Sequence, residues 1–83
     1  MTNLDTNFQL SPFGDFLGIE QVSSDDTKSL CRMSLSSSHF NAGGRVHGGV
    51  LSSLADTAAG LVVRVYRPEH PVSATTDLSI AFI

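Results

Sequence analysis

A pair of glycines followed eight residues later by an aspartate is the feature of this 83-residue sequence best suited to chemistry. Gly48 and Gly49 stand where a helix is expected to begin, and a glycine leaves its backbone N–H open because it has no Cβ. Amide groups at a helix N-terminus stabilise negative charge, such as the charge that develops on a carbonyl oxygen under attack. The glycines also suit a tight turn into the helix, and the sequence alone leaves both interpretations open.

The aspartate, Asp56, is the only carboxylate within the expected helix. Aspartate is a poor helix former, and here it interrupts a run rich in Ala, Leu and Val, so a reason other than helix propensity is needed. An ionised carboxylate can attack an acyl carbon or deprotonate a water molecule. A mid-helix Asp is usually a solvated residue, but this setting makes Asp56 a candidate nucleophile or general base.

The spacing of these groups implies a dimer. Gly48 and Asp56 are eight residues apart, which separates their backbones by about 12 Å along a helix. A reacting atom must lie about 3 Å from both its nucleophile or base and its oxyanion donor. If both groups serve one reaction, Gly48 of one chain must therefore face Asp56 of another chain in a two-fold dimer.

Other arrangements of reactive residues are incomplete. Ser52, Ser53, His47 and Asp56 are the residue types of a hydrolase triad, but the chain has no G-x-S-x-G motif. The segment AGGRVHGG lacks the GK[ST] of a phosphate-binding loop. One Cys and three scattered His give neither a disulfide nor a zinc site, so we expect no metal or other cofactor. We expect His47 to form hydrogen bonds at the helix start.

The elements that must position these residues follow from apolar periodicity. Residues 47–65 predict an amphipathic helix with an unusually wide apolar side, ended by Pro68 and Pro71. Residues 17–36 predict a β-hairpin with a turn at 23–26, and residues 13–17 predict one helical turn. Residues 72–82 alternate strictly and predict a long strand. The expected fold class is therefore α+β, with a sheet wrapped on one helix. The residues expected on the apolar side of the helix are Val50, Leu51, Leu54, Ala55, Ala58, Ala59, Leu61, Val62 and Val65.

Length and composition limit the remaining possibilities. The chain suits one domain, which we place at residues 12–83 after a loose segment at 1–11. A net charge of −3 without a basic cluster argues against nucleic acid as a partner. The acidic N-terminus, the absence of a span of about 18 apolar residues and the lone Cys favour a cytoplasmic protein that is not inserted in a membrane. Because an apolar strand stops abruptly at Ile83, we expect the sequence to be a truncated form of a longer one.

Residues 12–83 resemble the hotdog-fold acyl-CoA thioesterases of the phenylacetate-degradation type (PaaI-like). Their pattern N-x-x-G-x-x-H-G-G, followed by a helix bearing the catalytic Asp, matches this sequence in register. The segments PFGDFLGIE and TTDLSIAF also resemble that family's sequences before and after its central helix. The matching motif residues are Asn41, Gly44, His47, Gly48, Gly49 and Asp56.

The resemblance implies a sheet around a central helix, a homodimer or a dimer of dimers, and acyl-CoA substrates bound at the subunit interface. It implies that Asp56 is the nucleophile or general base and that the Gly48 amide polarises the thioester carbonyl. Asn41 and His47 would organise the site, while Gly49 and Thr75 would contact the substrate or its attacking water. The family's sheet has at least two further strands. A non-catalytic acyl-CoA-binding module and an inactive fragment therefore remain as alternatives.

Overall fold

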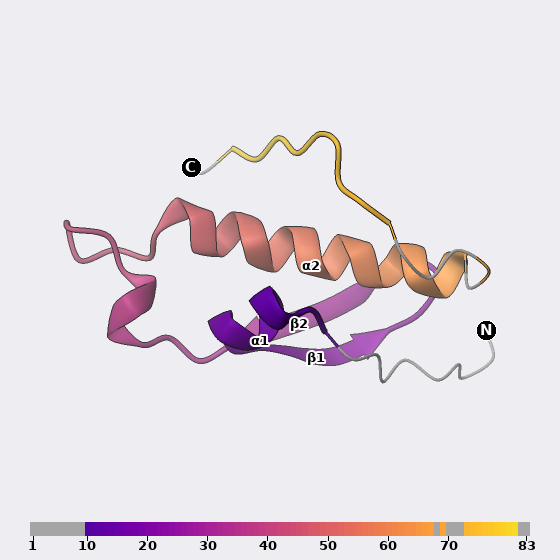
Figure 1. Cartoon of the computed structure of the whole chain (residues 1–83), viewed down its shortest axis with the longest axis horizontal. Helices are drawn as coiled ribbons and strands as arrows, with labels where there is room; N and C mark the ends of the chain where they lie inside the picture. The colour runs from indigo at the N-terminus through magenta and orange to yellow at the C-terminus, as the bar shows by residue number, and fades with distance from the viewer. Residues whose placement is uncertain (1–9, 68, 70–72, 82–83) are drawn as a thin grey trace.

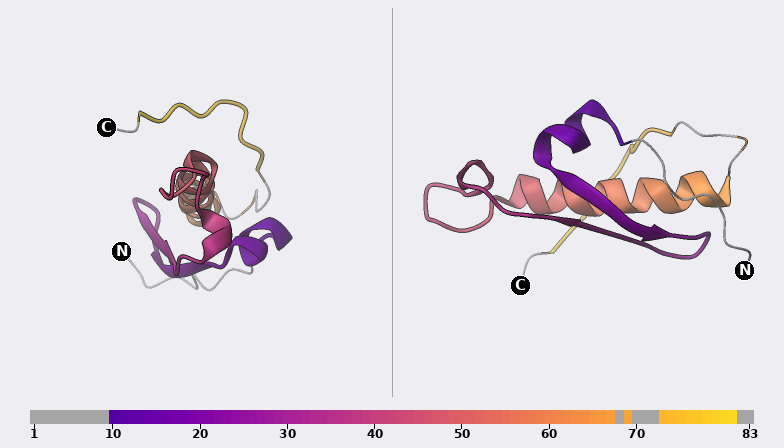
Figure 2. Two further views of the ribbon diagram at one scale, coloured as in Figure 1. Left: turned by 90° about the vertical axis from the view of Figure 1, so that its left-hand side faces the viewer. Right: turned by 90° about the horizontal axis from the view of Figure 1, so that it is seen from below.

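The computed structural model describes residues 10–67, 69 and 73–81 (Figure 1). In this part of the chain, two antiparallel strands lie against one long helix, with a short helix beside them (Figures 1 and 2). The predicted α+β class is confirmed. The elements in chain order are α1 (Pro12–Leu17), β1 (Ile19–Ser24), β2 (Ser29–Met33), the 3-10 helix η1 (Ser37–His39) and α2 (Gly48–Tyr66).

The short helix α1 confirms the helical turn predicted near residues 13–17. Ser11 caps its start, since the Ser11 Oγ accepts the Gly14 N–H at 3.0 Å, and Pro12 occupies the first turn. Gly18 ends the helix with a φ of 83°, a left-handed conformation that favours glycine. Residues 1–9 of the segment predicted to be loose lie outside the described residues.

The predicted hairpin forms, with its turn slightly later than expected. β1 runs to Ser24, and the Oδ1 atom of Asp25 accepts the backbone N–H groups of Thr27 and Lys28 at 2.8 and 3.0 Å. The Thr27 N–H and hydroxyl, more than any other groups, lower the pKa of Asp25. Leu35, predicted to share a face with Cys31 and Met33, is exposed because β2 ends at Met33.

A β-bulge interrupts the pairing of β1 with β2. Gln21 pairs with Cys31 and Ser23 pairs with Leu30, so Val22 is an extra residue without a partner in the register. As a result, the more buried positions of β1 are Ile19, Gln21 and then Ser24. A bulge bends its strand and increases the local twist, and the strands cross obliquely beneath α2 (Figure 2, right).

One side of α2 packs on this hairpin. Val50, Leu61 and Val65 are buried on that side, and the Ser29 hydroxyl of β2 donates a hydrogen bond to the Ala58 carbonyl. The predicted bounds are confirmed to within one residue, with His47 as the N-cap and Arg67 as the C-cap.

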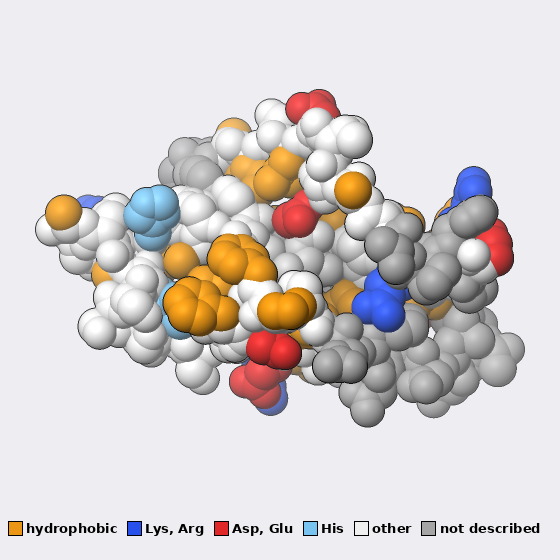
Figure 3. Space-filling model, in the orientation of Figure 1, with side chains coloured by type: hydrophobic (Ala, Val, Ile, Leu, Met, Phe, Trp, Pro, Cys, Tyr) orange, Lys and Arg blue, Asp and Glu red, His pale blue; other side chains and the backbone are white. Residues whose placement is uncertain are grey.

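The expected width of the buried side of α2 was wrong. Leu51, Ala55 and Ala59 are exposed, because the two strands of the described sheet cover only one side of the helix. Phe13 and Phe16 of α1 are exposed too, and Figure 3 shows hydrophobic side chains gathered on the surface around α1. The described residues therefore bury only a small core.

By length and composition, α2 could also cross a membrane. It has 19 residues, and its most apolar 18-residue window has a mean hydropathy of 1.2. This corrects the expectation that no stretch approaches such a span. The core helix of a soluble protein passes the same test, so the observation carries little weight by itself.

The strand predicted at 72–82 does not form within the described residues. Residues 73–81 are exposed and have no regular secondary structure. They lie on the side of α2 opposite the hairpin, so the helix separates them from the strands with which they could pair (Figures 1 and 2). Strand residues need a hydrogen-bonded neighbour, and none is present on this side among the described residues.

Candidate active site

The loop that leads into α2 is closed by its own backbone. The His47 N–H donates to the His39 carbonyl at 2.8 Å, and the Asn41 N–H donates to the Arg45 carbonyl at 2.7 Å. Phe40 and Val46 form an isolated antiparallel bridge between these two bonds. The chain therefore enters and leaves the loop side by side, which sets where the helix begins.

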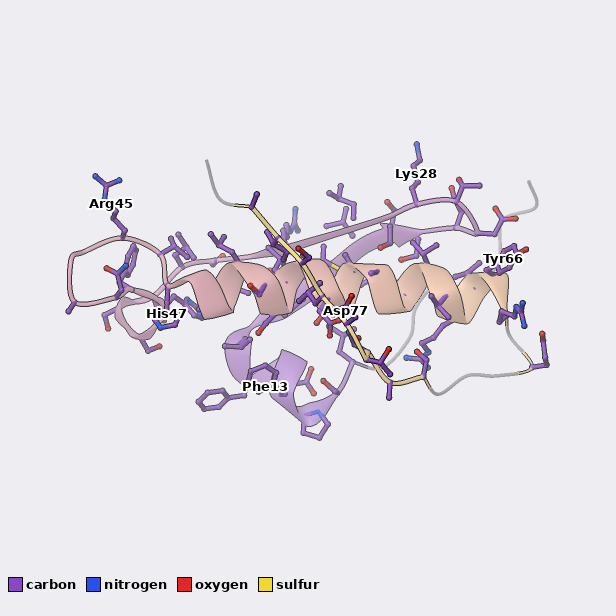
Figure 4. All side chains as sticks on the ribbon, turned by 90° about the horizontal axis from the view of Figure 1, so that it is seen from above. Phe13, Lys28, Arg45, His47, Tyr66 and Asp77 are labelled. Atoms are coloured by element: carbon purple, nitrogen blue, oxygen red, sulfur yellow. The ribbon has the colours of Figure 1, made fainter. Side chains whose placement is uncertain are left out.

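Asn41 organises the tip of this loop. Its Oδ1 atom accepts the N–H groups of Gly43 and Arg45 at 2.9 and 3.1 Å. Gly44, with a φ of 79°, donates its N–H to the Asn41 carbonyl at 3.0 Å. Figure 4 shows the Arg45 side chain pointing away from α2 at this tip. The Asn41 side chain thus acts within the loop.

His47 caps the start of α2 (Figure 4). Its Nδ1 atom accepts the Gly49 N–H at 2.8 Å, and its carbonyl accepts the N–H groups of Val50 and Leu51 at 2.9 and 3.3 Å. Because Nδ1 is an acceptor, the neutral ring carries its proton on Nε2. As expected, His47 forms hydrogen bonds at the helix start.

The Gly48 N–H is the exception at this helix end. The amides of His47, Gly49 and Val50 all have acceptors, whereas the Gly48 N–H has none among the described residues. This half-buried N–H lies at the positive end of a 19-residue helix, so it can donate a hydrogen bond to a developing oxyanion.

Gly49 is needed for the cap itself. A Cβ at this position would lie 3.0 Å from Nδ1 and 3.3 Å from Cε1 of His47, closer than side-chain atoms normally pack. The small residue therefore lets the imidazole sit over the first turn. This gives Gly49 a structural task beside the substrate contact implied by the resemblance.

The Asp56 carboxylate lies in the middle of α2 and is half-buried. Its Oδ1 atom accepts a hydrogen bond from the Thr75 hydroxyl at 2.5 Å. Segment 73–81 crosses over the middle of α2 near Asp77, as Figure 4 shows. The Oδ2 atom has no hydrogen bond among the described residues, which leaves one carboxylate oxygen available to a substrate or a water.

The predicted site residues therefore form two groups. The first group is at the N-terminal end of α2, and the second is the pair Asp56 and Thr75. Eight residues of helix separate Gly48 from Asp56, which is about 12 Å. Within one chain, the amide and the carboxylate cannot reach the same acyl carbon. The first group consists of Asn41, His47, Gly48 and Gly49.

Sequence reasoning missed one residue at this end of the helix. His39, one of the three scattered His and without a predicted role, is only 6% exposed, and its Nε2 atom is 2.9 Å from the Leu17 carbonyl. Serines precede it and an exposed Phe40 follows it, so its neighbours give no signal of burial.

Comparison with known proteins finds similarity to thioesterases and to an esterase. Residues 43–83 match the model of the thioesterase superfamily. A protein of Halobacterium salinarum named "Putative esterase" is 36% identical over 74 residues, which cover 82% of this chain and 48% of that protein. The chain thus spans about half the length of the curated relative it matches. No solved structure matches the chain.

The matched segment begins in the loop that precedes α2 and includes the helix with both Gly48 and Asp56. The N-terminal hairpin lies outside it but packs on the same helix. The described α+β arrangement is consistent with part of a hotdog fold from the thioesterase superfamily.

Proposed function

We propose that this chain forms part of a hydrolase that cleaves acyl-CoA thioesters to a free acid and CoA, as PaaI-like thioesterases do. The observation that carries the proposal is the Gly48 N–H, which lacks an acceptor among the described residues, on the same helix as a carboxylate with one open oxygen. The match to the thioesterase superfamily supports it.

In the proposed mechanism, the thioester carbonyl oxygen accepts a hydrogen bond from Gly48 of one protomer. The Asp56 carboxylate of the other protomer either attacks the carbonyl carbon or removes a proton from an attacking water. In the first route a C–O bond forms, the C–S bond breaks and water then hydrolyses the mixed anhydride. Both routes end in a carboxylic acid and a thiol, and the Thr75 hydroxyl holds Asp56 in place.

A thioester suits these groups better than an ordinary ester. A thiol ionises near pH 8.5, so a thiolate leaves readily, whereas an alkoxide leaves poorly unless an acid protonates it. In the nucleophilic route, a carboxylate and a backbone amide supply negative charge and a hydrogen bond without providing that acid. We therefore favour acyl-CoA over alkyl esters as the substrate class.

Thiol release from a panel of acyl-CoAs tests the proposal directly. Asp56→Asn keeps the size and the hydrogen-bond acceptor for Thr75 but removes the charge, and it should lower kcat by orders of magnitude. Asp77→Asn is the matched control, because Asp77 is an exposed carboxylate on the crossing segment and should leave kcat unchanged. Equal activity of both variants would end the catalytic assignment of Asp56.

Mixing two inactive variants tests whether the site is shared between protomers. Gly48→Pro removes the N–H at the first helical position, where proline is well accepted. His47 has a φ of −63° and a ψ of 136°, within the extended region that the residue before a proline adopts. Random assortment with Asp56→Asn should restore about a quarter of the wild-type activity, because half the dimers regain one of two sites. No recovery would contradict a site that is shared between Gly48 of one protomer and Asp56 of the other.

Calorimetry separates this proposal from a non-catalytic module. Acyl-CoA binding that depends on Gly48, without thiol release by any variant or by the wild type, would identify a binding module in place of a hydrolase.

A further inference from the structure

We propose that His39 is a positioning residue that fixes the Gly48 amide, an inference that rests on the proposed role of that amide. His39 is one of two buried polar residues in the described part of the chain, and it is 6% exposed. The resemblance gives it no role, and its side chain does not reach the helix start. Its influence must therefore pass through other groups, which the hydrogen bonds identify.

The His39 ring joins two segments that are distant in sequence. Its Nδ1 atom accepts the Ser36 N–H at 2.9 Å, so the ring proton is on Nε2, which donates to the Leu17 carbonyl at 2.9 Å. Leu17 is the last residue of α1, and its carbonyl has no partner within that helix. The imidazole thus ties the end of α1 to the 3-10 turn.

The backbone of the same residue reaches the site. The His39 carbonyl accepts the His47 N–H at 2.8 Å, directly before the Gly48 peptide. The direction of the Gly48 N–H depends on where His47 is held. Because the ring and the carbonyl belong to the same residue, a displacement of the ring also moves the carbonyl that accepts the His47 N–H. Small displacements of an oxyanion donor cost much of its effect, because that effect depends on prior orientation.

The first test replaces His39 and follows both structure and rate. In His39→Ala, the His47 and Gly49 amide protons should exchange at least about tenfold faster, since their acceptors lose a fixed position. With an acyl-CoA as substrate, the kcat of the His39→Ala dimer should be about 10- to 100-fold below that of the wild-type dimer, while KM changes little. If His39→Ala does not fold, His39→Leu, which also lacks both ring nitrogens but fills more of the buried space, takes its place with the same criteria.

Val65→Ala is the matched control. Val65 is 5% exposed and lies about 27 Å from His47 along α2, so its truncation weakens the core far from the site. It should lower the melting temperature by a similar amount and speed exchange near the C-terminal end of α2, with kcat unchanged. An equal loss of kcat in both variants would mean that His39 acts only through stability.

Partial rescue identifies which ring atom matters. Gln can place its side-chain NH₂ near the position of Nε2 and donate to Leu17, whereas Asn can place its oxygen near Nδ1 and accept from Ser36. Recovery of His47 amide protection and kcat by either variant, relative to Ala, supports the positioning role. Two results would overturn it. One is a loss of kcat in His39→Ala without faster exchange of the His47 amide proton, and the other is a His47 exchange rate that is the same in His39→Ala and Val65→Ala. If the wild type releases no thiol, the proposed function fails while the exchange data still decide this inference.

Discussion

The two groups of the candidate site differ in how the chain builds them. At the N-terminal end of α2, backbone hydrogen bonds close the loop from His39 to His47, and the Asn41 and His47 side chains hold three further amides. In the middle of the helix, the Asp56 carboxylate has a single described partner, Thr75, on an exposed segment without regular structure.

The amide and the carboxylate are therefore positioned by different kinds of contact. The Gly48 amide is placed by residues close to it in sequence, together with the buried His39, and this placement is complete within one chain. The Thr75 contact spans 19 residues and comes from an exposed segment without regular structure. We therefore expect substitutions at the helix start to have larger and more localised effects than substitutions on the crossing segment.

Among the substitutions that compare the helix start with the crossing segment, Gly48→Pro measured alone should have the largest effect. Loss of one preorganised oxyanion donor costs about 10²–10³ in kcat. The Gly48 N–H has no acceptor among the described residues, so the melting temperature should change little. Gly48→Ala retains the N–H and is the control; a comparable loss of kcat in that variant would point to crowding by the side chain.

A smaller effect is expected from Thr75→Val. The exposed hydroxyl orients Asp56 through one hydrogen bond, so its loss should reduce kcat about three- to tenfold, which corresponds to the net worth of a typical intramolecular hydrogen bond. Thr76→Val makes the same chemical change on the neighbouring residue and should be neutral. If Thr75→Val reduced kcat more than Gly48→Pro, the contrast between the two groups would be reversed.

The smallest effects should appear in stability, at two glycines of α2. Gly60→Ala has no heavy atom within 4 Å of the new Cβ and should raise the free energy of unfolding by about 0.5–1 kcal/mol. Gly49→Ala offers the same gain in helix propensity, but its Cβ crowds the His47 ring and puts at risk a cap worth about 1 kcal/mol. Denaturant titration should place Gly60→Ala above Gly49→Ala, and equal stabilities would show that the ring moves aside without cost.

Local sequence rules predicted the elements whose signals lie within a few residues. The short apolar stretch at residues 13–17 predicted α1, and Gly48-Gly49 before a long amphipathic run predicted the start of α2. The turn chemistry at Ser23–Asp26 predicted the hairpin to within two residues. The grouping of Asn41 with His47 and Gly48 also follows from their closeness in sequence.

Features that depend on distant partners were not predictable in this way. The alternation of residues 73–81 is a strand pattern, but pairing requires a neighbour, and α2 lies between this segment and the hairpin. Likewise, the helical periodicity gives an apolar side for α2 without stating how many strands cover it, so Leu51 and Ala59 were misassigned. Burial of His39 depends on the Leu17 carbonyl, 22 residues away.

Because Val22 is an extra residue, odd-numbered positions before it and an even-numbered position after it are the more buried ones in β1. Ile19 and Gln21 follow one parity toward α2, whereas Ser24 follows the other. Because Val22 has no partner in the register, removing it would let β1 pair continuously with β2, while Ser24 kept both its partner Ser29 and its facing. Deletion of a single residue should thus be tolerated at Val22, whereas inserting or deleting one paired residue of β1 would turn the residues on one side of the change toward the opposite face of the sheet.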